Sequence, residues 1–183
     1  MGIRLSSLSA PTELDVMGHE DKSIHPSEDL TPLHLIETGG RTALICIGDK
    51  ALSERVAQVV QKLDYHVVVA QEPASALTRL EYDQYYLIIL DEKYGRTDSS
   101  GNPVLLYLQR LPMPVRRRSF LCLLSVEAPT LDHMAAFRAG ANLILNLQDV
   151  GKMGAILDRV VKDLQIFYAI FSDELGKRGK YPA

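Results

Sequence analysis

The sequence predicts a single α/β domain with a doubly wound, five-stranded parallel sheet, followed by an extended C-terminal helix. Two observations predict this class: short apolar runs recur along residues 41–183, and segments with helical spacing of apolar residues separate them. Strands that alternate with helices imply a parallel sheet covered on both faces. Residues 1–40 show no sustained period and are rich in Ser, Pro, Thr and acids. We therefore expect them to form an irregular, flexible acidic tail or docking segment.

The elements follow one another in a regular order. The expected strands are residues 43–47, 66–70, 86–90, 120–124 and 143–147. Apolar residues from Leu52 to Leu63 have the spacing of a helix with one buried face, and Pro73 and Pro103 suit the first turns of the next two helices. Thr130 is the expected N-cap of the helix between the fourth and fifth strands.

The last helix is predicted to run from Val150 to Leu175, about 40 Å at 1.5 Å per residue, which is well beyond a sheet of five-residue strands. Its apolar positions follow 4-3-4-3-4 spacing, at Met153, Leu157, Val160, Leu164, Phe167 and Phe171. The distal positions, expected to bind a partner, are Leu164, Phe167, Tyr168 and Phe171. We expect a protein partner or a second copy to cover them; the alternative is that Leu33, Leu35 and Ile36 of the tail fold back and cover them.

Composition excludes several classes of protein. Hydrophobic residues make up 46% of the 183 residues and charged residues 23%, as in ordinary globular proteins. Residues 1–40 hold two basic and seven acidic side chains (net −5) and the rest eighteen and sixteen (net +2), so we expect no nucleic-acid binding. No apolar run reaches membrane-spanning length, and we expect no membrane association. Cys46 and Cys122 lie within apolar runs, which suits a reducing, cytoplasmic location.

Three polar residues follow predicted strands: Asp49 after the first, Asp91 after the third and Ser125 after the fourth. The carboxyl ends of parallel strands meet at one edge of an open sheet, where ligands and chemistry gather. Each residue also has a plain structural explanation. Asp91 can close the turn after its strand, Asp49 can cap the next helix, and Ser125 can satisfy turn amides.

With Asp91 after an apolar strand, the turn LDY at 63–65 and the motif AGAN at 139–142, the chain resembles bacterial response-regulator receiver domains of the CheY-like superfamily. The resemblance covers about residues 42–165. It implies the flavodoxin-like strand order 2-1-3-4-5 and a place in signal transduction by phosphorelay. In that chemistry Asp91 would accept the phosphoryl group, Ser125 would bind a phosphoryl oxygen, and Mg²⁺ would be held by Asp49 and Asp91.

The sequence departs from the family at three positions that this chemistry needs. Leu147 stands where the family has its lysine, Ile144 where it has its aromatic switch residue, and Gly48 where it has one of two acids. The resemblance is therefore to a degenerate pseudo-receiver, a non-catalytic signalling or scaffold module. It would need no cofactor, with Mg²⁺ required only if Asp91 is phosphorylated.

Two other functions stay open at the level of sequence. One is a working receiver that tolerates an incomplete site and is phosphorylated on Asp91. The other is a small-ligand sensor in which Leu147 and Ile144 line the crevice. No other motif makes an independent case for an enzyme.

Overall fold

The structure, a computed structural model, describes residues 41–96 and 101–177, and for residues 170–177 only the backbone. The strands are β1 (Thr42–Cys46), β2 (His66–Ala70), β3 (Leu87–Asp91), β4 (Phe120–Ser125) and β5 (Leu143–Asn146). The helices are α1 (Lys50–Gln61), α2 (Pro73–Tyr82), α3 (Pro103–Arg110), α4 (Met113–Arg116), α5 (His133–Ala139) and α6 (Met153–Lys177), with a 3-10 helix, η2 (Leu147–Lys152), before α6. Every predicted strand is found to within one residue at each end. The predicted tail, with its docking segment 30–37, lies outside the described residues.

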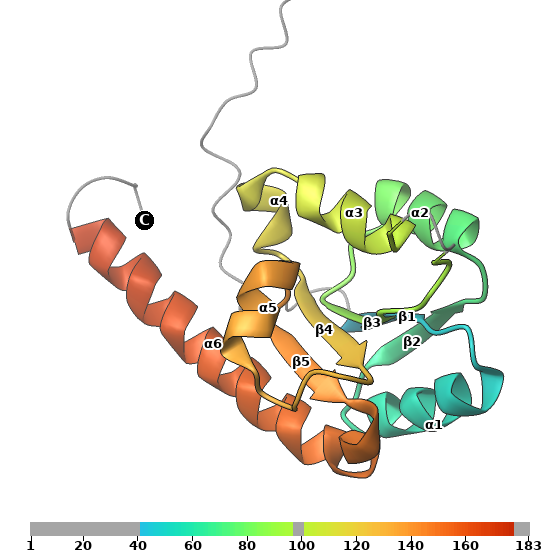
Figure 1. The fold of residues 1–183 in the computed structure, drawn as a ribbon. Helices are drawn as coiled ribbons and strands as arrows, with labels where there is room; N and C mark the ends of the chain where they lie inside the picture. Colours follow the sequence, from blue (N-terminus) through green and yellow to red (C-terminus); the bar gives the residue numbers. More distant parts are fainter. Residues whose placement is uncertain (1–40, 97–100, 178–183) are drawn as a thin grey trace, which may run out of the picture.

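The five strands are parallel and lie in the order β2-β1-β3-β4-β5, so the predicted strand order is confirmed. In this register Ala43 of β1 has Val67 of β2 on one side and Leu87 of β3 on the other. Helices α1 and α6 cover one face of the sheet, and α2, α3 and α5 cover the other (Figure 1). The sheet therefore separates two hydrophobic cores, as the doubly wound class requires.

Strands β1, β3 and β4 are apolar at nearly every position because both of their faces are covered. In β4 all six residues are buried, including the polar Ser125 at its end. Strand β2 lies at the edge of the sheet and is more exposed. The polar carboxyl ends of the inner strands are thus held on a rigid, buried framework.

Aspartates cap two of the helices that follow strands. Asp49 caps α1, accepting a 2.7 Å hydrogen bond from an amide three residues on, and Asp132 caps α5 in the same way at 2.9 Å. The prediction that Thr130 caps this helix was wrong, because the helix begins later and the Thr130 hydroxyl is bonded to Asp149 instead. The helix α5 ends at Gly140, whose φ of 65° suits a glycine C-cap.

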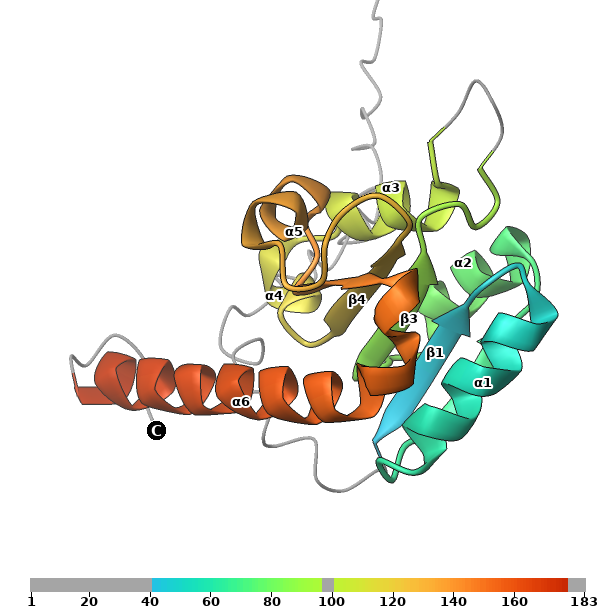
Figure 2. The same ribbon diagram turned by 60° about the horizontal axis from the view of Figure 1, so that its bottom comes forward.

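The last helix begins at Met153, three residues later than predicted, because η2 occupies the first turns of the expected segment. Met153, Leu157 and Val161 are buried in the core under the sheet, whereas Val160 is only half-buried. Beyond them the helix continues past the sheet, and Phe167 is 59% exposed (Figure 2). None of the helices within residues 41–96 and 101–177 is both long and apolar enough to cross a membrane.

Candidate functional site

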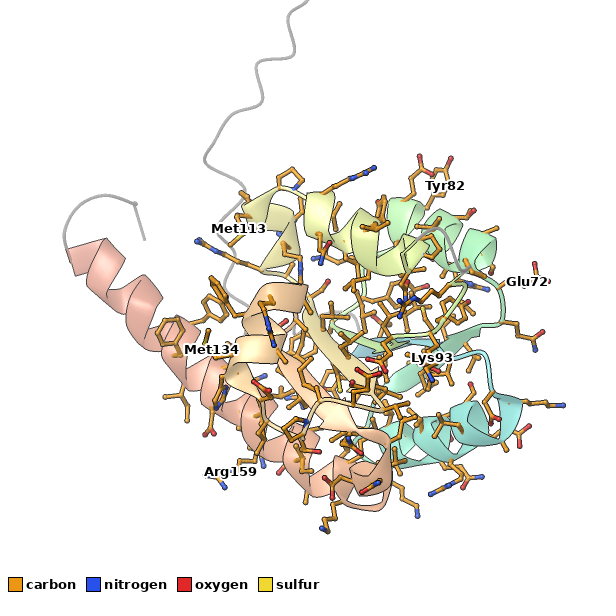
Figure 3. The ribbon with its side chains drawn as sticks, in the orientation of Figure 1. Glu72, Tyr82, Lys93, Met113, Met134 and Arg159 are labelled. Atoms are coloured by element: carbon orange, nitrogen blue, oxygen red, sulfur yellow. The ribbon has the colours of Figure 1, made fainter. Side chains whose placement is uncertain are left out.

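Asp91 and Ser125 end the neighbouring strands β3 and β4, so the sheet brings them to the same edge. The half-buried Asp91 carboxylate accepts a hydrogen bond from the amide of Lys93, with 2.9 Å between Oδ1 and N. Lys93 marks this edge in Figure 3. The Asn102 side chain donates to the main-chain carbonyl of Asp91 at 2.9 Å. The Asp91 side chain therefore helps to close the turn after its strand, the plain role considered for it from sequence.

The Ser125 hydroxyl, expected to bind a phosphoryl oxygen, is bonded to a glutamate of the chain itself. Ser125 Oγ donates to Glu92 Oε2 at 2.7 Å, and the amide of Val126 donates to Glu92 Oε1 at 2.9 Å. Ser125 is 3% exposed, and its Oγ also accepts hydrogen bonds from the amides of Glu127 and Ala128 at 3.3 and 3.1 Å. One proton and two lone pairs are all that a hydroxyl has, so Ser125 is fully used within the chain.

This arrangement is an anion site that the chain fills itself. A hydroxyl beside a backbone amide is a pair of donors suited to an oxyanion, and hydrogen bonds to a carboxylate are stronger than neutral ones. Here the oxyanion is the Glu92 carboxylate, which comes directly after Asp91 in the chain. A phosphoryl group on Asp91 would have to displace Glu92 before it could reach Ser125.

Asp49, the second predicted magnesium ligand, uses its Oδ1 to cap α1. Its neighbour Gly48 stands where the family has another acid, and a Cβ built there would meet no described atom within 4 Å. Packing therefore leaves room for a side chain at this position. Among the described residues, no three His, Cys, Asp or Glu side chains are grouped as metal ligands.

Leu147 and Ile144 lie in different cores. Leu147, at the start of η2, packs against the core between the sheet and helices α1 and α6. Ile144 is 2% exposed and belongs to the core on the opposite face. The two side chains therefore do not line one crevice, and the expectation of a ligand crevice formed by this pair was wrong.

The loop between β4 and α5 is tied to the end of β5 by three side chains. The Thr130 hydroxyl donates to Asp149 Oδ2 at 2.7 Å and accepts from the amide of Asn146 at 2.9 Å. The side-chain amide of Asn146 donates to the carbonyl of Ala128 at 2.9 Å. Hydrogen bonds from Thr130 and then from Lys152 lower the pKa of Asp149. Any change that moved this loop would have to break these bonds.

Sequence reasoning missed Glu92 and Asn102. Glu92 gave a weak signal, since a second acid directly after Asp91 lies at the edge where strand ends meet. Asn102 precedes Pro103 and could have been recognised as a helix cap. It accepts hydrogen bonds from the amides of Val104 and Leu105 at 3.0 and 3.1 Å while it donates to the end of β3.

The four residues expected to bind a partner lie on the distal half of α6. Leu164 and Tyr168 are half-buried against the core, whereas Phe167 and its neighbour Ile166 are each 59% exposed. The side chain of Phe171 lies outside the part of the chain that the structure describes. These positions thus lie on one helix, in the part of α6 that extends beyond the edge of the sheet (Figure 2).

Comparisons with solved structures give the class of this fold. The receiver domain of the Francisella response regulator 1452 matches 67% of this chain and 98% of its own, with 14% identity and a TM-score of 0.53. The N-terminal domain of a three-domain response regulator, sensory box and GGDEF protein from Carboxydothermus hydrogenoformans matches 72% and 98%, with 16% identity and a TM-score of 0.52. The BeF3-activated receiver domain of DrrB matches 66% and 97%, with 15% identity and a TM-score of 0.51.

The chain therefore has the fold of CheY-like response-regulator receiver domains, with a long C-terminal helix in addition. No protein-family model matches the sequence, and no curated protein matches it. At these identities the likeness concerns the fold, so function must be argued from the residues of this chain.

Proposed function

We propose that this protein is a non-catalytic, cytoplasmic signalling or scaffold module: a pseudo-receiver that binds a protein partner or a second copy of itself through α6. The observation that carries the proposal is the pair of hydrogen bonds by which Ser125 and Val126 hold the Glu92 carboxylate. The site's hydroxyl and its adjacent amide are occupied by the chain's own anion. Leu147, which cannot bind an anion, stands where the family has a lysine.

The size of these losses favours an inactive switch. A hydrogen bond to a charged group contributes about 1.5–3 kcal/mol, so a missing ammonium alone would weaken phosphoryl binding by about one to two powers of ten. Displacing Glu92 from Ser125 would cost a further bond of the same kind. Gly48 removes one carboxylate from the magnesium site, which weakens the binding of a hard cation as well.

The proposed working surface is the distal half of α6, with Leu164, Phe167, Tyr168 and Phe171. Phe167 exposes a large apolar ring at a position where the sheet provides no cover. Exposed aromatic residues grouped on one surface are typical of protein–protein interfaces.

The test is the intact mass of the protein after incubation with acetyl phosphate and Mg²⁺. We expect the wild type and Asp91→Asn to keep the same mass. A phosphoryl group gained by the wild type and absent from Asp91→Asn would contradict the proposal. It would support the second candidate, a receiver phosphorylated on Asp91 in a two-component phosphorelay, with Mg²⁺ held by Asp49 and Asp91. That candidate is favoured by the position of Asp91 beside Ser125 at the strand ends.

A rebuilt site serves as the positive control. The triple variant Gly48→Asp, Glu92→Ala and Leu147→Lys restores the missing acid and lysine and releases the Ser125 hydroxyl. We expect it to gain a phosphoryl group under the same conditions, provided that circular dichroism shows it folded. Adding Asp91→Asn to the triple variant should abolish the gain.

A further inference from the structure

The connection between α3 and β4 forms a basic and apolar patch on the surface, which we define as residues 110–118 and which contains α4. It includes four arginines, and no acidic residue occurs anywhere from Gly101 to Val126. Met113, labelled on α4 in Figure 3, is 59% exposed, and Val115 is 45% exposed. The patch therefore offers positive charge together with apolar surface, a combination that marks interaction sites.

The charges of the patch are available to a carboxylate. Arg110 and Arg117 are exposed, and neither forms an ion pair with another residue in the part of the chain that the structure describes. Arg116 donates to the main-chain carbonyls of Ser119 and Gly140, which hold its side chain in place without neutralising its charge. An acidic segment could therefore form charge-assisted hydrogen bonds with these guanidinium groups.

The chain that precedes Arg41 joins the sheet close to this patch. The amide of Tyr86 donates to the carbonyl of Thr42 at 3.0 Å, and the carbonyl of Tyr86 accepts from the amide of Phe120 at 2.7 Å. Neighbouring strands are about 4.8 Å apart, so Thr42 and Phe120 lie about 10 Å from each other. Because Phe120 comes two residues after the patch, the first strand begins about 10 Å from one end of it.

The sequence just before Arg41 complements the patch. Residues 23–40 contain three acids and no lysine or arginine. Within them, the stretch EDLTPLHLIE at residues 28–37 has acids at both ends and four aliphatic residues between. The patch has arginines at both ends and apolar residues between. The two ends of residues 28–37 can lie up to about 43 and about 13 Å from Arg41, at 3.3 Å per residue, so the stretch can reach the patch.

We propose that residues 28–37 dock on this patch of the same chain, with their aliphatic side chains against Met113 and Val115 and their carboxylates against the arginines. Exposed ion pairs are individually weak, so the apolar contact must contribute as well. A linker of three residues, 38–40, keeps the effective concentration of the segment at the patch on the order of millimolar. A weak intrinsic affinity is therefore sufficient. The patch is not part of the α6 surface in the proposed function, and the docking does not depend on that surface.

Charge favours the tail of the chain itself over an anionic membrane or a nucleic acid. Either of these would also suit four arginines, but each would be repelled by residues 1–40, whose net charge is −5. Helix α6 is a poorer site for the acidic segment, because its charges are already paired. Lys162 is paired with Asp158 at 2.8 Å, and Arg159 with Asp163 at 3.9 Å.

A nitroxide attached at Thr31→Cys in the full chain tests where the segment lies. The label is selective because both native thiols are buried. We expect paramagnetic broadening of the Met113 methyl signal and of the amide signals of residues 111–118, and none at α1, on the other side of the molecule (Figure 1). Nitroxide-labelled chains mixed with isotope-labelled chains that carry no nitroxide should show no broadening. An unbroadened patch in the labelled chain, or a broadened one in the mixture, would overturn the inference.

A charge swap tests whether the contact is specific. Arg110→Glu combined with Arg117→Glu should lower the ratio of docked to free segment at least about fivefold, because carboxylates then face the acids of the segment. Adding Glu28→Lys and Glu37→Lys to that variant should restore the broadening at Met113. The matched control is Arg55→Glu, which changes an exposed arginine on α1 and should leave the broadening unchanged. A swap that restores nothing, or an equal loss in the control, would refute the docking.

Co-sedimentation with vesicles of phosphatidylcholine and phosphatidylserine tests the membrane as an occupant. We expect the full chain to stay in the supernatant, with the patch covered by its own tail. Binding to the vesicles that disappears in the variant with Arg110→Glu and Arg117→Glu would assign the patch to a lipid surface and reject the inference.

Discussion

Gly95, in the turn after β3, has a backbone conformation that only glycine adopts easily. Its φ is 62°, and a Cβ there would overlap with Cγ of Pro73 in α2. We expect Gly95→Ala to lower the free energy of unfolding by at least about 2 kcal/mol, because strain and overlap with a rigid ring act together. Urea denaturation measures the change. The control is Gly48→Ala, which meets no described atom within 4 Å and should stay within about 0.5 kcal/mol of wild type; equal losses would contradict the steric explanation.

The roles of single residues were only partly predictable from sequence. The capping role of Asp49 involves only residues close to it in the sequence, so the sequence could suggest it, beside a role in binding Mg²⁺. The role of Glu92 depends on Ser125, which is 33 positions away and meets it only because β3 and β4 are neighbours in a fixed register. A side-chain pair that depends on register across strands is not visible in either segment alone.

The loop between β4 and α5 is held by a local set of hydrogen bonds centred on Thr130. We expect Thr130→Val to destabilise the protein at neutral pH, because the variant loses the hydroxyl group. That hydroxyl donates a hydrogen bond to Asp149 and accepts one from the amide of Asn146. The lowered pKa of Asp149 gives the sign of the pH dependence. Its contribution is present above the unfolded pKa near 3.8 and is lost as the pH falls through the folded value.

Thermal denaturation from pH 7 to pH 2.5 measures this effect. The difference between the wild type and Thr130→Val should shrink on acidification as the Asp149 contribution disappears. The Thr130→Ser variant keeps the hydroxyl and should follow the wild type. A difference that stayed constant with pH would show that Asp149 has no part in it.

Helix α6 has two halves with different surroundings: the proximal half packs in the core, and the distal half is more exposed. Leu157, in the proximal half, is 1% exposed, so Leu157→Ala should lower the free energy of unfolding by about 2–5 kcal/mol. Phe167→Ala should cost the monomer less than about 1 kcal/mol, since more than half of the ring is already in water. Urea titration of both variants at one low protein concentration compares the two. A large loss from Phe167→Ala in the monomer would mean that the chain covers this ring itself.

Element boundaries show where sequence reasoning reached its limit. Strands were predicted to within a residue because each is an apolar run bounded by turn residues. The start of the last helix was predicted too early because η2 precedes it. The apolar residues of η2 continue into α6 at spacings that an α-helix would also show. The distinction between 3-10 and α-helical turns depends on hydrogen bonds that the pattern does not reveal.

At the scale of the whole molecule, the two cores lie on opposite faces of one sheet, and each contains a cysteine. Cys46 belongs to the core under α2, α3 and α5, and Cys122 to the core under α1 and α6. Burial raises the pKa of both thiols to about 12, so both stay protonated at pH 8. Thiolate is the reactive form, and we therefore expect no reaction with a thiol reagent in the folded protein.

Urea titration with pulsed alkylation tests whether the two cores unfold together. Both thiols should become reactive at the same urea concentration, because the sheet joins the cores into one cooperative unit. Burial raises the pKa of both thiols from 9.0 to about 12, so the thiols of the unfolded chain ionise at a lower pH than those of the folded protein. The free energy of unfolding should therefore be unaffected by these groups below about pH 9 and should fall as the pH rises from there towards 12. Separate midpoints for Cys46 and Cys122 would show that the cores are independent.

The fold as a whole was predictable because its evidence is repeated along the chain. Five apolar runs and the intervening helical segments all indicate a parallel sheet, so an error in one element, such as the cap at Thr130, does not change the class. The candidate site has no such repetition. It depends on a few side chains, and among them the contacts of Ser125 could be known only from the structure.

The hydrogen bond between Glu92 and Ser125 has a thermodynamic consequence for the proposed pseudo-receiver. A receiver that is phosphorylated and then hydrolysed consumes a high-energy donor in each cycle, and it can be held away from equilibrium. A domain whose anion is a carboxylate of its own chain consumes no phosphoryl donor. Its free and partner-bound states are therefore populated at equilibrium, according to mass action alone. Its output would then follow the amounts of chain and partner in the cell, so that synthesis and degradation would supply the signal and the time needed to reset it.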